Sequence, residues 1–163
     1  MTIRPAISQD RESILDIFME IIAAGETFAL PQNLSRASAL AFWCADENTV
    51  FVCEERGRIL GSYYLKPNHS GPGSHVANAG YIVADGERGK HIGRTMAEHS
   101  IDQARQLGFR SMQFNLVVST NESAVRLWRQ LGFAIVGTLP GVFRHPSRGY
   151  VDAYLMFMDL ISP

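Results

Sequence analysis

The chain of 163 residues is 46% hydrophobic and 19% charged, and its formal net charge is −1. Its length fits a single domain over residues 1–163 with a sizeable core, and its balanced charge offers neither a basic stripe for nucleic acid nor a disordered acidic tail. No apolar run approaches the ~18 residues that span a bilayer and the N-terminus lacks a signal-peptide pattern, so we expect a cytoplasmic protein that binds neither membrane nor nucleic acid.

The two cysteines show no metal-binding pattern. Cys44 and Cys53 stand nine positions apart, without the spacing of metal ligands. Such isolated residues are typical of reduced, partly buried thiols in a cytosolic protein. We therefore predict free thiols and no metal site.

The first part of the chain combines one short strand with two helices. Residues 2–7 form the predicted strand, and Ser8 can cap a helix whose apolar residues recur at i, i+3, i+4 and i+7. Gly25 is suited to end this helix in the left-handed conformation. The linker 25–31 is unusually apolar, and a second helix is expected from about Ser35.

Three strands are expected in the middle of the chain. Residues 49–54 and 58–66 are β-prone and are separated by a turn sequence at 55–57, which predicts a hairpin. A Gly/Pro/Ser-rich loop at 67–74 precedes the third strand, 75–83.

The last part of the chain contains the same helix-ending triplet at two positions. The triplet Leu-Gly-Phe occurs at 107–109 and at 131–133, where glycine fits the C′ position and phenylalanine the apolar C″ position of a Schellman motif. The helix before the first triplet starts near residue 90 and is predicted to bury Ile92, Met96, Ile101, Ala104 and Leu107. Asn121 caps the helix before the second triplet, and strands are expected at 111–118, 134–142 and 150–158. The predicted order is β-α-α-β-β-β-α-β-α-β-β.

Residues 81–94 lead from a strand through a polar turn into a helix. The first N–H groups of a helix lack intrahelical partners and carry the positive end of the helix dipole. Gly89 and Gly93 would let an anion approach the backbone, and Lys90 and Arg94 add positive charge. The pattern predicts a phosphate or pyrophosphate site. The alternative is a solvated turn after a core strand.

Two widespread phosphate motifs do not fit this turn. A Walker loop needs glycine where the chain has Ala84, and Ser or Thr where it has His91. No stretch supplies the three glycines of a dinucleotide-binding fingerprint.

The segment 88–93 reads Arg-Gly-Lys-His-Ile-Gly and resembles the acetyl-coenzyme A (acetyl-CoA) motif of the GNAT (GCN5-related) N-acetyltransferases, Gln/Arg-x-x-Gly-x-Gly/Ala. His91 replaces the central glycine. The block 121–133 resembles the family's next signature, Asn-x-x-Ala-x-x-Leu-Tyr-x-x-x-Gly-Phe, and the order of elements is that of the family. The resemblance implies an α/β (or α+β) GNAT fold, with a mixed, mostly antiparallel seven-stranded sheet and four helices, splayed between strands 4 and 5.

The resemblance also implies where acetyl-CoA lies. The pantetheine arm would enter the splay and pair with the backbone of the fourth strand, and the pyrophosphate would lie on the N–H groups of residues 89–94. Asn121 would meet the pantetheine or the acetyl end, although it also fits a plain helix cap. The residues expected to contact the cofactor are Ile82, Val83, Arg88, Gly89, Lys90, His91, Ile92, Gly93, Arg94, Asn121 and Trp128.

The implied reaction is direct attack of an amine on the thioester. A backbone N–H near Val83 could polarise the thioester carbonyl. The family's usual general acid is a tyrosine, and its position here holds Trp128, whose indole N–H is no practical proton source. We expect His75 or Tyr150 to serve as acid or base, since histidine titrates near pH ~6.5. Other candidates are His145, Tyr81 and Asp152, and ordered water could replace them all.

Two asparagines point to the acceptor. Asn78 and Asn115 lie inside the strands that would border the splay, although asparagine is disfavoured in strands. Their amides could bind a carboxylate- or amide-bearing substrate, or they could bond to a strand end. The segments 75–80 and 114–116 also resemble the azetidine-2-carboxylate acetyltransferase branch of the family, which implies a small amine acceptor that carries a carboxylate.

The apolar linker before the second helix is expected either to line the acceptor site or to pack against it, with Glu26 and Phe28 near the substrate. Three functions remain open. The first is an acetyl-CoA-dependent N-acetyltransferase for a small, amino-acid-like amine, with a homodimer expected by family analogy. The second is a protein or peptide N-acetyltransferase, and the third is a non-catalytic acyl-CoA-binding module.

Overall fold

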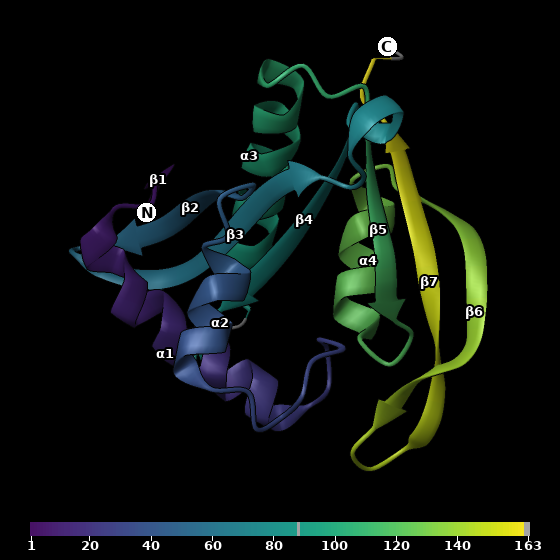
Figure 1. The fold of residues 1–163 in the computed structure, drawn as a ribbon, viewed down its shortest axis with the longest axis horizontal. Helices are drawn as coiled ribbons and strands as arrows, with labels where there is room; N and C mark the ends of the chain where they lie inside the picture. Colours follow the sequence, from purple (N-terminus) through teal and green to yellow (C-terminus); the bar gives the residue numbers. More distant parts are fainter. Residues whose placement is uncertain (88, 162–163) are drawn as a thin grey trace.

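The computed structural model describes residues 1–87 and 89–161. Within these residues, seven strands form one sheet and four α-helices cover its two faces (Figure 1). The strands are β1 (Thr2–Pro5), β2 (Thr49–Glu55), β3 (Arg58–Pro67), β4 (Val76–Val83), β5 (Ser111–Val118), β6 (Ala134–His145) and β7 (Gly149–Asp159). The helices are α1 (Arg11–Ala24), α2 (Arg36–Trp43), α3 (Ile92–Gln106) and α4 (Glu122–Gln130), with 3₁₀ turns at Ser8–Asp10 and Gly71–Gly73. The predicted order of strands and helices is confirmed.

The sheet has the order β1-β2-β3-β4-β5-β7-β6, and its neighbours are antiparallel except for β4 and β5. In the described residues this parallel pair has two register positions, Val76 with Ser111 and Ala77 with Met112. Beyond them β4 and β5 separate, as Figure 1 shows. The predicted mixed, mostly antiparallel sheet with a splay between the fourth and fifth strands is therefore confirmed.

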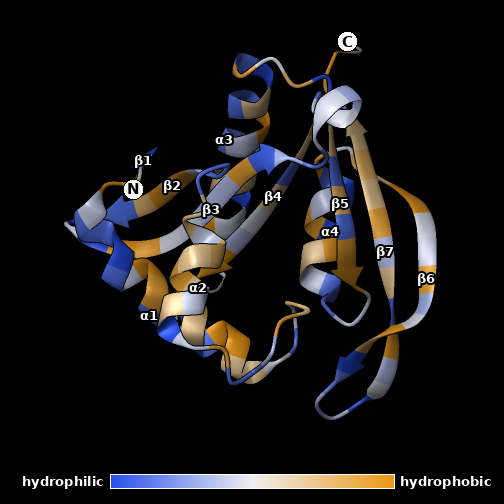
Figure 2. Cartoon of the chain, viewed as in Figure 1, coloured by the Kyte–Doolittle hydropathy of each residue, from blue (hydrophilic) through white to orange (hydrophobic). Residues whose placement is uncertain are grey.

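Successive side chains of a strand point to opposite faces of the sheet and pack into one of two hydrophobic layers. The first layer lies under α3 and α4, and the second lies under α1 and α2. In β2, Phe51 and Cys53 belong to the layer with α3 and α4, while Val52 belongs to the layer with α1 and α2. Figure 2 shows these apolar stretches along the strands and on the helices. The loop after α1 joins the second layer, where Phe28 packs edge-on against Phe18 with ring centroids 5.3 Å apart.

Both Leu-Gly-Phe triplets form the predicted Schellman motif. In the first, the Phe109 N–H donates to the Ala104 carbonyl at 3.0 Å and Gly108 has a φ of 85°. The triplet 131–133 makes the equivalent bonds. The predicted burial of Leu107 is wrong, since this side chain is 52% exposed. Leu107 is the C-cap residue and lies beyond the turns of α3 that pack on the sheet.

The β6–β7 hairpin is longer than the sequence indicates. The strands expected at 134–142 and 150–158 leave residues 143–149 as the connection between them, but Arg144 pairs with Tyr150 and His145 pairs with Gly149. The ladder thus continues almost to the tip of the hairpin. As a result, the turn at 146–148 projects beyond the rest of the sheet (Figure 1).

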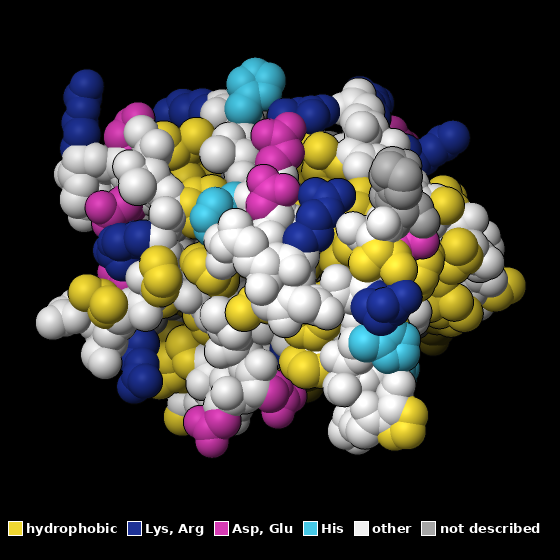
Figure 3. Space-filling model, turned by 90° about the horizontal axis from the view of Figure 1, so that it is seen from above, with side chains coloured by type: hydrophobic (Ala, Val, Ile, Leu, Met, Phe, Trp, Pro, Cys, Tyr) yellow, Lys and Arg dark blue, Asp and Glu magenta, His cyan; other side chains and the backbone are white. Residues whose placement is uncertain are grey.

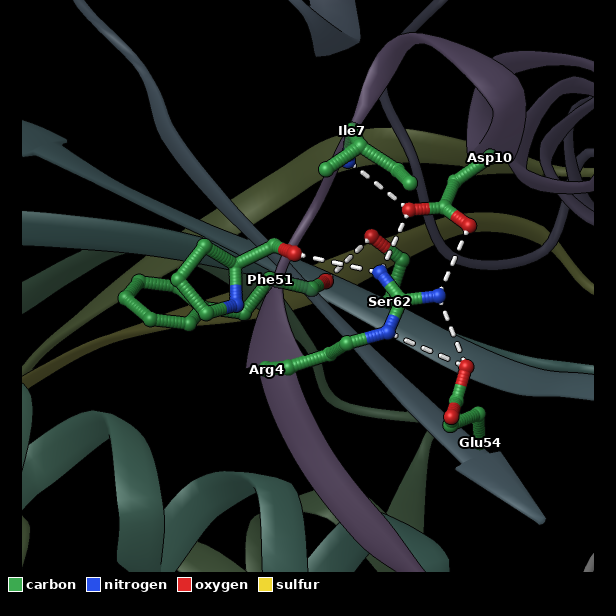
Figure 4. A network of polar contacts seen from close by, with 7 residues as sticks. Arg4, Ile7, Asp10, Phe51, Glu54 and Ser62 are labelled. Atoms are coloured by element: carbon green, nitrogen blue, oxygen red, sulfur yellow. Dashed lines mark hydrogen bonds and ion pairs between the residues drawn. The ribbon is translucent and has the colours of Figure 1, made fainter.

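Arg4 joins β1 to β2 and to the turn that precedes α1 (Figure 4). Its guanidinium donates to the two carboxylate oxygens of Asp10 at 2.7 and 3.0 Å, and to Oε2 of Glu54 at 2.7 and 3.1 Å. Asp10 also accepts a hydrogen bond from the Ile7 N–H at 2.8 Å. The guanidinium holds the pKa of the Asp10 carboxyl below its usual range. This network fixes the start of the chain to the sheet.

On the face shown in Figure 3, Lys and Arg side chains are interspersed with Asp and Glu, and neither sign gathers into a stripe. Across residues 1–87 and 89–161, no helix combines the length and the apolar character needed to span a bilayer.

Candidate active site

The splay between β4 and β5 opens into a cleft of about 1330 Å³. The loop between α1 and α2 lines one side of it, and the first turn of α3 together with α4 lines the other. Segments far apart in the sequence therefore meet here. The residues singled out by the sequence that line the cleft are Glu26, Phe28, Asn78, Tyr81, Ile82, Val83, Gly89, His91, Ile92, Gly93, Arg94, Asn115, Asn121, Trp128 and His145.

The start of α3 presents its backbone to this cleft. His91 is the N-cap and has a left-handed backbone with a φ of 61°, a conformation that histidine tolerates better than most residues. His91 thus adopts the conformation for which glycine is usually required. No side-chain bond from the described residues caps the helix, and a Cβ added to Gly93 would meet no atom within 4 Å. The uncovered N–H groups and the helix dipole make this turn suited to a pyrophosphate.

The charges at this turn are arranged differently from the expectation. Lys90 itself does not line the cleft, and its ammonium donates at 2.7 Å to the buried carboxylate of Glu87, which does line it. Glu87 also forms an ion pair with Arg58 at 3.1 Å, and the Lys90 hydrogen bond lowers the pKa of the Glu87 carboxyl. Arg94 does line the cleft, where its guanidinium donates to Gln130 on α4. Arg88 lies outside the described residues.

The edge of β4 that faces the splay carries free backbone positions. The Ala84 N–H donates to the Leu60 carbonyl on β3 at 2.9 Å. Because successive N–H groups of a strand point to opposite edges, the Val83 N–H points toward β5 and the cleft. Ile82 is 1% exposed, so its side chain anchors the strand in the core while its backbone borders the cleft. This geometry provides a donor for a carbonyl oxygen in the splay.

Asn78 and Asn115 meet across the splay through a third amide. The Oδ1 atom of Asn68 accepts from Nδ2 of Asn78 at 2.9 Å and from Nδ2 of Asn115 at 2.7 Å. The sequence does not identify Asn68, because an asparagine in a Gly/Pro/Ser-rich loop is ordinary. The two strand asparagines, in contrast, are recognisable because their residue type is out of place in a strand.

An aromatic wall closes the α4 side of the cleft. Trp128 is 7% exposed and packs against Tyr81 and Phe114, with ring centroids 4.9 and 4.6 Å apart. The Tyr81 hydroxyl is 2.7 Å from Oγ of Ser100. Burial raises the pKa of Tyr81 far above its usual value, so its phenol stays protonated.

The acid and base candidates divide by position. His75, Tyr150 and Asp152 do not line the cleft, so the structure does not bring the expected catalytic side chains His75 and Tyr150 to it. His75 stands before β4 where the strands are still paired, and Tyr150 is 75% exposed on the hairpin. Asp152 accepts from the Gly141 N–H at 2.9 Å, which supports the irregular part of β6.

His145 is the histidine that the hairpin brings into the cleft, together with Arg148. It is 8% exposed, and its Nδ1 accepts from the Ser147 N–H at 3.2 Å. A ring nitrogen that accepts from a backbone N–H carries no proton, so the neutral ring would carry its proton on Nε2. His145 is then a hydrogen-bond donor toward its surroundings.

Asn121 caps α4 as predicted. Its Oδ1 accepts from the Ala124 N–H at 3.4 Å and from the Ser123 hydroxyl at 3.2 Å. The residue also lines the cleft, so both interpretations of Asn121 stay compatible with the structure. Arg126 is a further lining residue that the sequence did not single out, since an arginine on a polar helix face carries no special signal.

Both cysteines are free, and burial raises the pKa of each thiol. Such thiols are poor nucleophiles. Across the described parts of the chain, no three His, Cys, Asp or Glu side chains gather in a way that could hold a metal ion.

Residues 15–133 match the model of the acetyltransferase (GNAT) family. Over 98 residues, or 60% of the chain, the sequence is 42% identical to N-acetyltransferase aca1 of Schizosaccharomyces pombe. Over 146 residues it is 27% identical to the L-methionine sulfoximine/L-methionine sulfone acetyltransferase of Salmonella typhimurium, covering 87% of this chain and 85% of that protein. The chain spans 47% of the length of aca1 and 13% of a second yeast relative.

Solved structures agree with this match. A GCN5-related N-acetyltransferase from Kribbella flavida is 41% identical and superimposes with a TM-score of 0.93, covering 97% of this chain and 96% of that one. YncA of Salmonella typhimurium, solved with its cofactor acetyl-CoA, is 26% identical with a TM-score of 0.88, covering 100% of this chain and 95% of that one. Since the family model covers most of the chain and the whole fold is shared, this protein belongs to the GNAT acetyltransferase family.

Proposed function

We propose that this protein is an acetyl-CoA-dependent N-acetyltransferase that acetylates the amine of a small, amino-acid-like acceptor. The observation that carries the proposal is the presence of two complementary features in one cleft. The uncovered start of α3 suits a pyrophosphate, and the amides of Asn78 and Asn115 suit a small polar acceptor. The splay lies in the same cleft, so the thioester end of the pantetheine arm would meet the acceptor there.

Acetyl-CoA is the cofactor in the similar YncA structure. In this chain we expect the N–H groups of residues 89–94 to hold its pyrophosphate, with Arg94 adding positive charge. The pantetheine would lie along the edge of β4 that faces the splay, where the Val83 N–H is directed and Ile82 lines the cleft, opposite Asn121 and Trp128 on the α4 side. Arg88 belongs to the same expectation through its place in the motif, and Lys90 contributes less because Glu87 already binds it.

In the proposed reaction, the neutral amine of the acceptor attacks the thioester carbonyl carbon. A C–N bond forms, the C–S bond breaks, and coenzyme A leaves as a thiolate while the proton of the amine passes to solvent or to the thiolate. The Val83 N–H would donate to the carbonyl oxygen as negative charge develops on it. Such a donor acts without changing its own protonation state.

Among the side-chain candidates, His145 and Tyr81 have the better position for assisting, because they line the cleft and His75 and Tyr150 do not. His145 could orient the acceptor through its Nε2–H. Tyr81 keeps its proton at neutral pH, but the Ser100 hydroxyl donates to the Ala97 carbonyl, so the Tyr81 hydroxyl donates to Ser100 at 2.7 Å and would have to leave that contact before it could donate to the sulfur. Trp128 serves as a wall.

The proposal of a small acceptor is supported by what covers the cleft. The loop with Glu26 and Phe28 borders it on one side, and the hairpin turn with Arg148 borders it as well. Such flanking segments leave less room for a polypeptide than an open groove would. The similarity to an acetyltransferase named for L-methionine sulfoximine and L-methionine sulfone points the same way.

The test begins with calorimetric titration of acetyl-CoA into the purified protein. A thiol-release assay then compares L-azetidine-2-carboxylate, L-methionine sulfone and peptides with free N-termini as acceptors. We expect micromolar binding and thiol release on a carboxylate-bearing small amine. Release on peptides alone would replace this proposal with a protein N-acetyltransferase. Absence of acetyl-CoA binding would refute it.

A further inference from the structure

Asn68 occupies a fixed position at the point where the splay begins. It follows the last residue of β3, and its backbone N–H donates to the Val76 carbonyl at the start of β4 at 2.8 Å. Its side chain reaches toward β5, where it bonds Asn115. β4 and β5 are paired in register only up to Ala77 among the described residues, so the Asn68 amide is a bridge between strands that have already separated.

The backbone dictates how the three amides are oriented. The Ala79 N–H donates to Oδ1 of Asn78 at 2.7 Å, and a backbone N–H can only donate. Nδ2 of Asn78 must therefore face Asn68 and donate to it, and the atom of Asn68 that accepts this hydrogen bond must be its Oδ1. The oxygen of Asn68 also receives Nδ2 of Asn115, whose own Oδ1 accepts from Gln113 at 2.9 Å. The orientation of each amide thus follows from one backbone group.

Among the described residues, the amides of Asn68, Asn78 and Asn115 have free donors but no oxygen without a partner. Each NH₂ group has two N–H donors, and Asn68 takes one from Asn78 and one from Asn115. The second N–H of each is bonded to no other described residue, while every oxygen of the three amides already accepts a hydrogen bond. Both strand asparagines line the cleft, so they offer it mainly donors.

We infer that Asn68 is a positioning residue that sets the acceptor specificity: it turns the NH₂ groups of Asn78 and Asn115 into a receptor for the carboxylate of the acceptor. This inference rests on the proposed N-acetyltransferase function and adds to it the residue that orients the two strand asparagines. A carboxylate only accepts hydrogen bonds and matches these donors. A carboxamide in the same place would bring its own NH₂ against them, and its oxygen alone could be bound.

The Asn68 side chain is costly as a purely structural element. Its Nδ2 atom is buried and has no hydrogen-bond partner among the described residues. A buried donor without a partner destabilises the fold. What asparagine provides at this position is the oxygen that accepts a hydrogen bond from both Asn78 and Asn115.

The experiment compares the ratio of kcat/KM for L-azetidine-2-carboxylate to that for its carboxamide. In Asn68→Ala the ratio should fall about tenfold through a higher KM for the carboxylate, because the two NH₂ groups lose their common acceptor. Asn68→Asp keeps an accepting oxygen but adds negative charge, so its preference should shift toward the carboxamide. Affinity for acetyl-CoA should stay unchanged in both variants.

Asn48→Ala is the matched control. Asn48 is another asparagine with one buried side-chain atom that lacks a partner, and its Nδ2 donates to the carbonyls of Phe42 and Trp43 at 3.0 and 2.9 Å. It does not line the cleft, so its loss should lower stability and leave the ratio unchanged. Equal ratios in Asn68→Ala and Asn48→Ala would overturn the inference.

A spectroscopic readout keeps this inference separate from the proposed function. Side-chain ¹⁵N amide signals of Asn78 and Asn115 should move in Asn68→Ala and remain close to wild type in Asn68→Asp. Titration with L-azetidine-2-carboxylate should shift the same wild-type signals more than its carboxamide does. If these signals shift as expected but no acceptor gives thiol release, the proposed catalysis is refuted and the carboxylate-binding role of the asparagines stands. If the signals respond neither to Asn68→Ala nor to the carboxylate, that binding role is refuted.

Discussion

Trp128 packs against Tyr81 with ring centroids 4.9 Å apart, so one wall of the cleft is also part of the hydrophobic core. Phe133, from the Schellman turn that ends α4, lies against the indole at 5.5 Å. Trp128 stands where the family signature has tyrosine, and at 7% exposure it is used for packing. In the proposed reaction, the proton of the leaving thiol would therefore be supplied by a group other than Trp128.

The first prediction separates the packing of Trp128 from chemistry. Trp128→Phe should retain acetyl transfer within about threefold, because the aromatic contacts persist and an indole N–H is no proton source. Trp128→Ala should lower the free energy of unfolding by about 3–5 kcal/mol, measured by urea denaturation. A phenylalanine variant that binds acetyl-CoA normally but no longer transfers acetyl would show that the indole takes part in the reaction.

The second prediction concerns Gly93, the open position in the first turn of α3. A Cβ there meets no neighbour, and alanine is a better helix former than glycine, so Gly93→Ala should fold at least as stably as wild type. The added methyl group would nevertheless occupy the space over the N–H groups. We expect the Kd for acetyl-CoA to rise about tenfold in Gly93→Ala and further in Gly93→Asp, whose charge repels the pyrophosphate.

Aspartate near a helix N-terminus is itself favourable, so Gly93→Asp also tests the binding site without a penalty to the helix. Thermal unfolding of both variants is the control. If calorimetry gives the wild-type affinity for both of them, the pyrophosphate does not lie on this turn.

The sequence identifies most elements because their limits are local. Gly25 and Gly108 end helices in the left-handed conformation, and this needs no knowledge of the rest of the fold. The extension of β6 to His145 is different, since Arg144 and His145 have no strand signal and are held by pairing with β7. The exposure of Leu107 likewise depends on how far α3 extends past the sheet.

The same distinction applies to the site. Asn78 and Asn115 can be recognised because their type is unusual in strands, but the bridge from Asn68 exists only once the loop after β3 is placed. In the sequence, His75 starts an expected strand and His145 lies in the expected connection between two strands, and neither position is favoured over the other for catalysis. The hairpin register brings the second into the cleft and leaves the first outside it.

The third prediction ranks the two cations at the start of α3. Arg94→Ala should raise the Kd for acetyl-CoA about tenfold, because its guanidinium lines the cleft. Lys90→Ala should raise it by less than about threefold, since the ammonium is already bound by Glu87 at 2.7 Å. Calorimetry at two salt concentrations checks the order, and equal losses in the two variants would contradict it.

The fourth prediction assigns Asn115 to the acceptor. Asn115→Ala should raise the KM for a carboxylate-bearing amine about tenfold, because one of the two NH₂ donors is lost. The Kd for acetyl-CoA should not change, since Asn115 belongs to the group of three asparagines and not to the start of α3, where the pyrophosphate is expected. A fall in acetyl-CoA affinity with an unaltered acceptor KM would make Asn115 a structural residue of β5.

The fifth prediction concerns the pH dependence of stability. Arg4 lowers the pKa of Asp10 in the folded state, so this carboxylate stabilises the protein above its unfolded pKa of about 3.9, and the contribution disappears as the pH falls through the lower folded pKa. Asp10→Asn should lower the free energy of unfolding by about 2 kcal/mol at pH 7, a difference that shrinks below about pH 4.

Asp16→Asn is the matched control, because Asp16 pairs with Arg36 at 3.0 Å but is 69% exposed, and such surface pairs contribute about 0–1 kcal/mol. Urea denaturation at several pH values measures both variants. Equal losses at pH 7, or a loss for Asp10→Asn that stays constant into acid, would show that the Arg4 network does not stabilise the fold through the charge of Asp10.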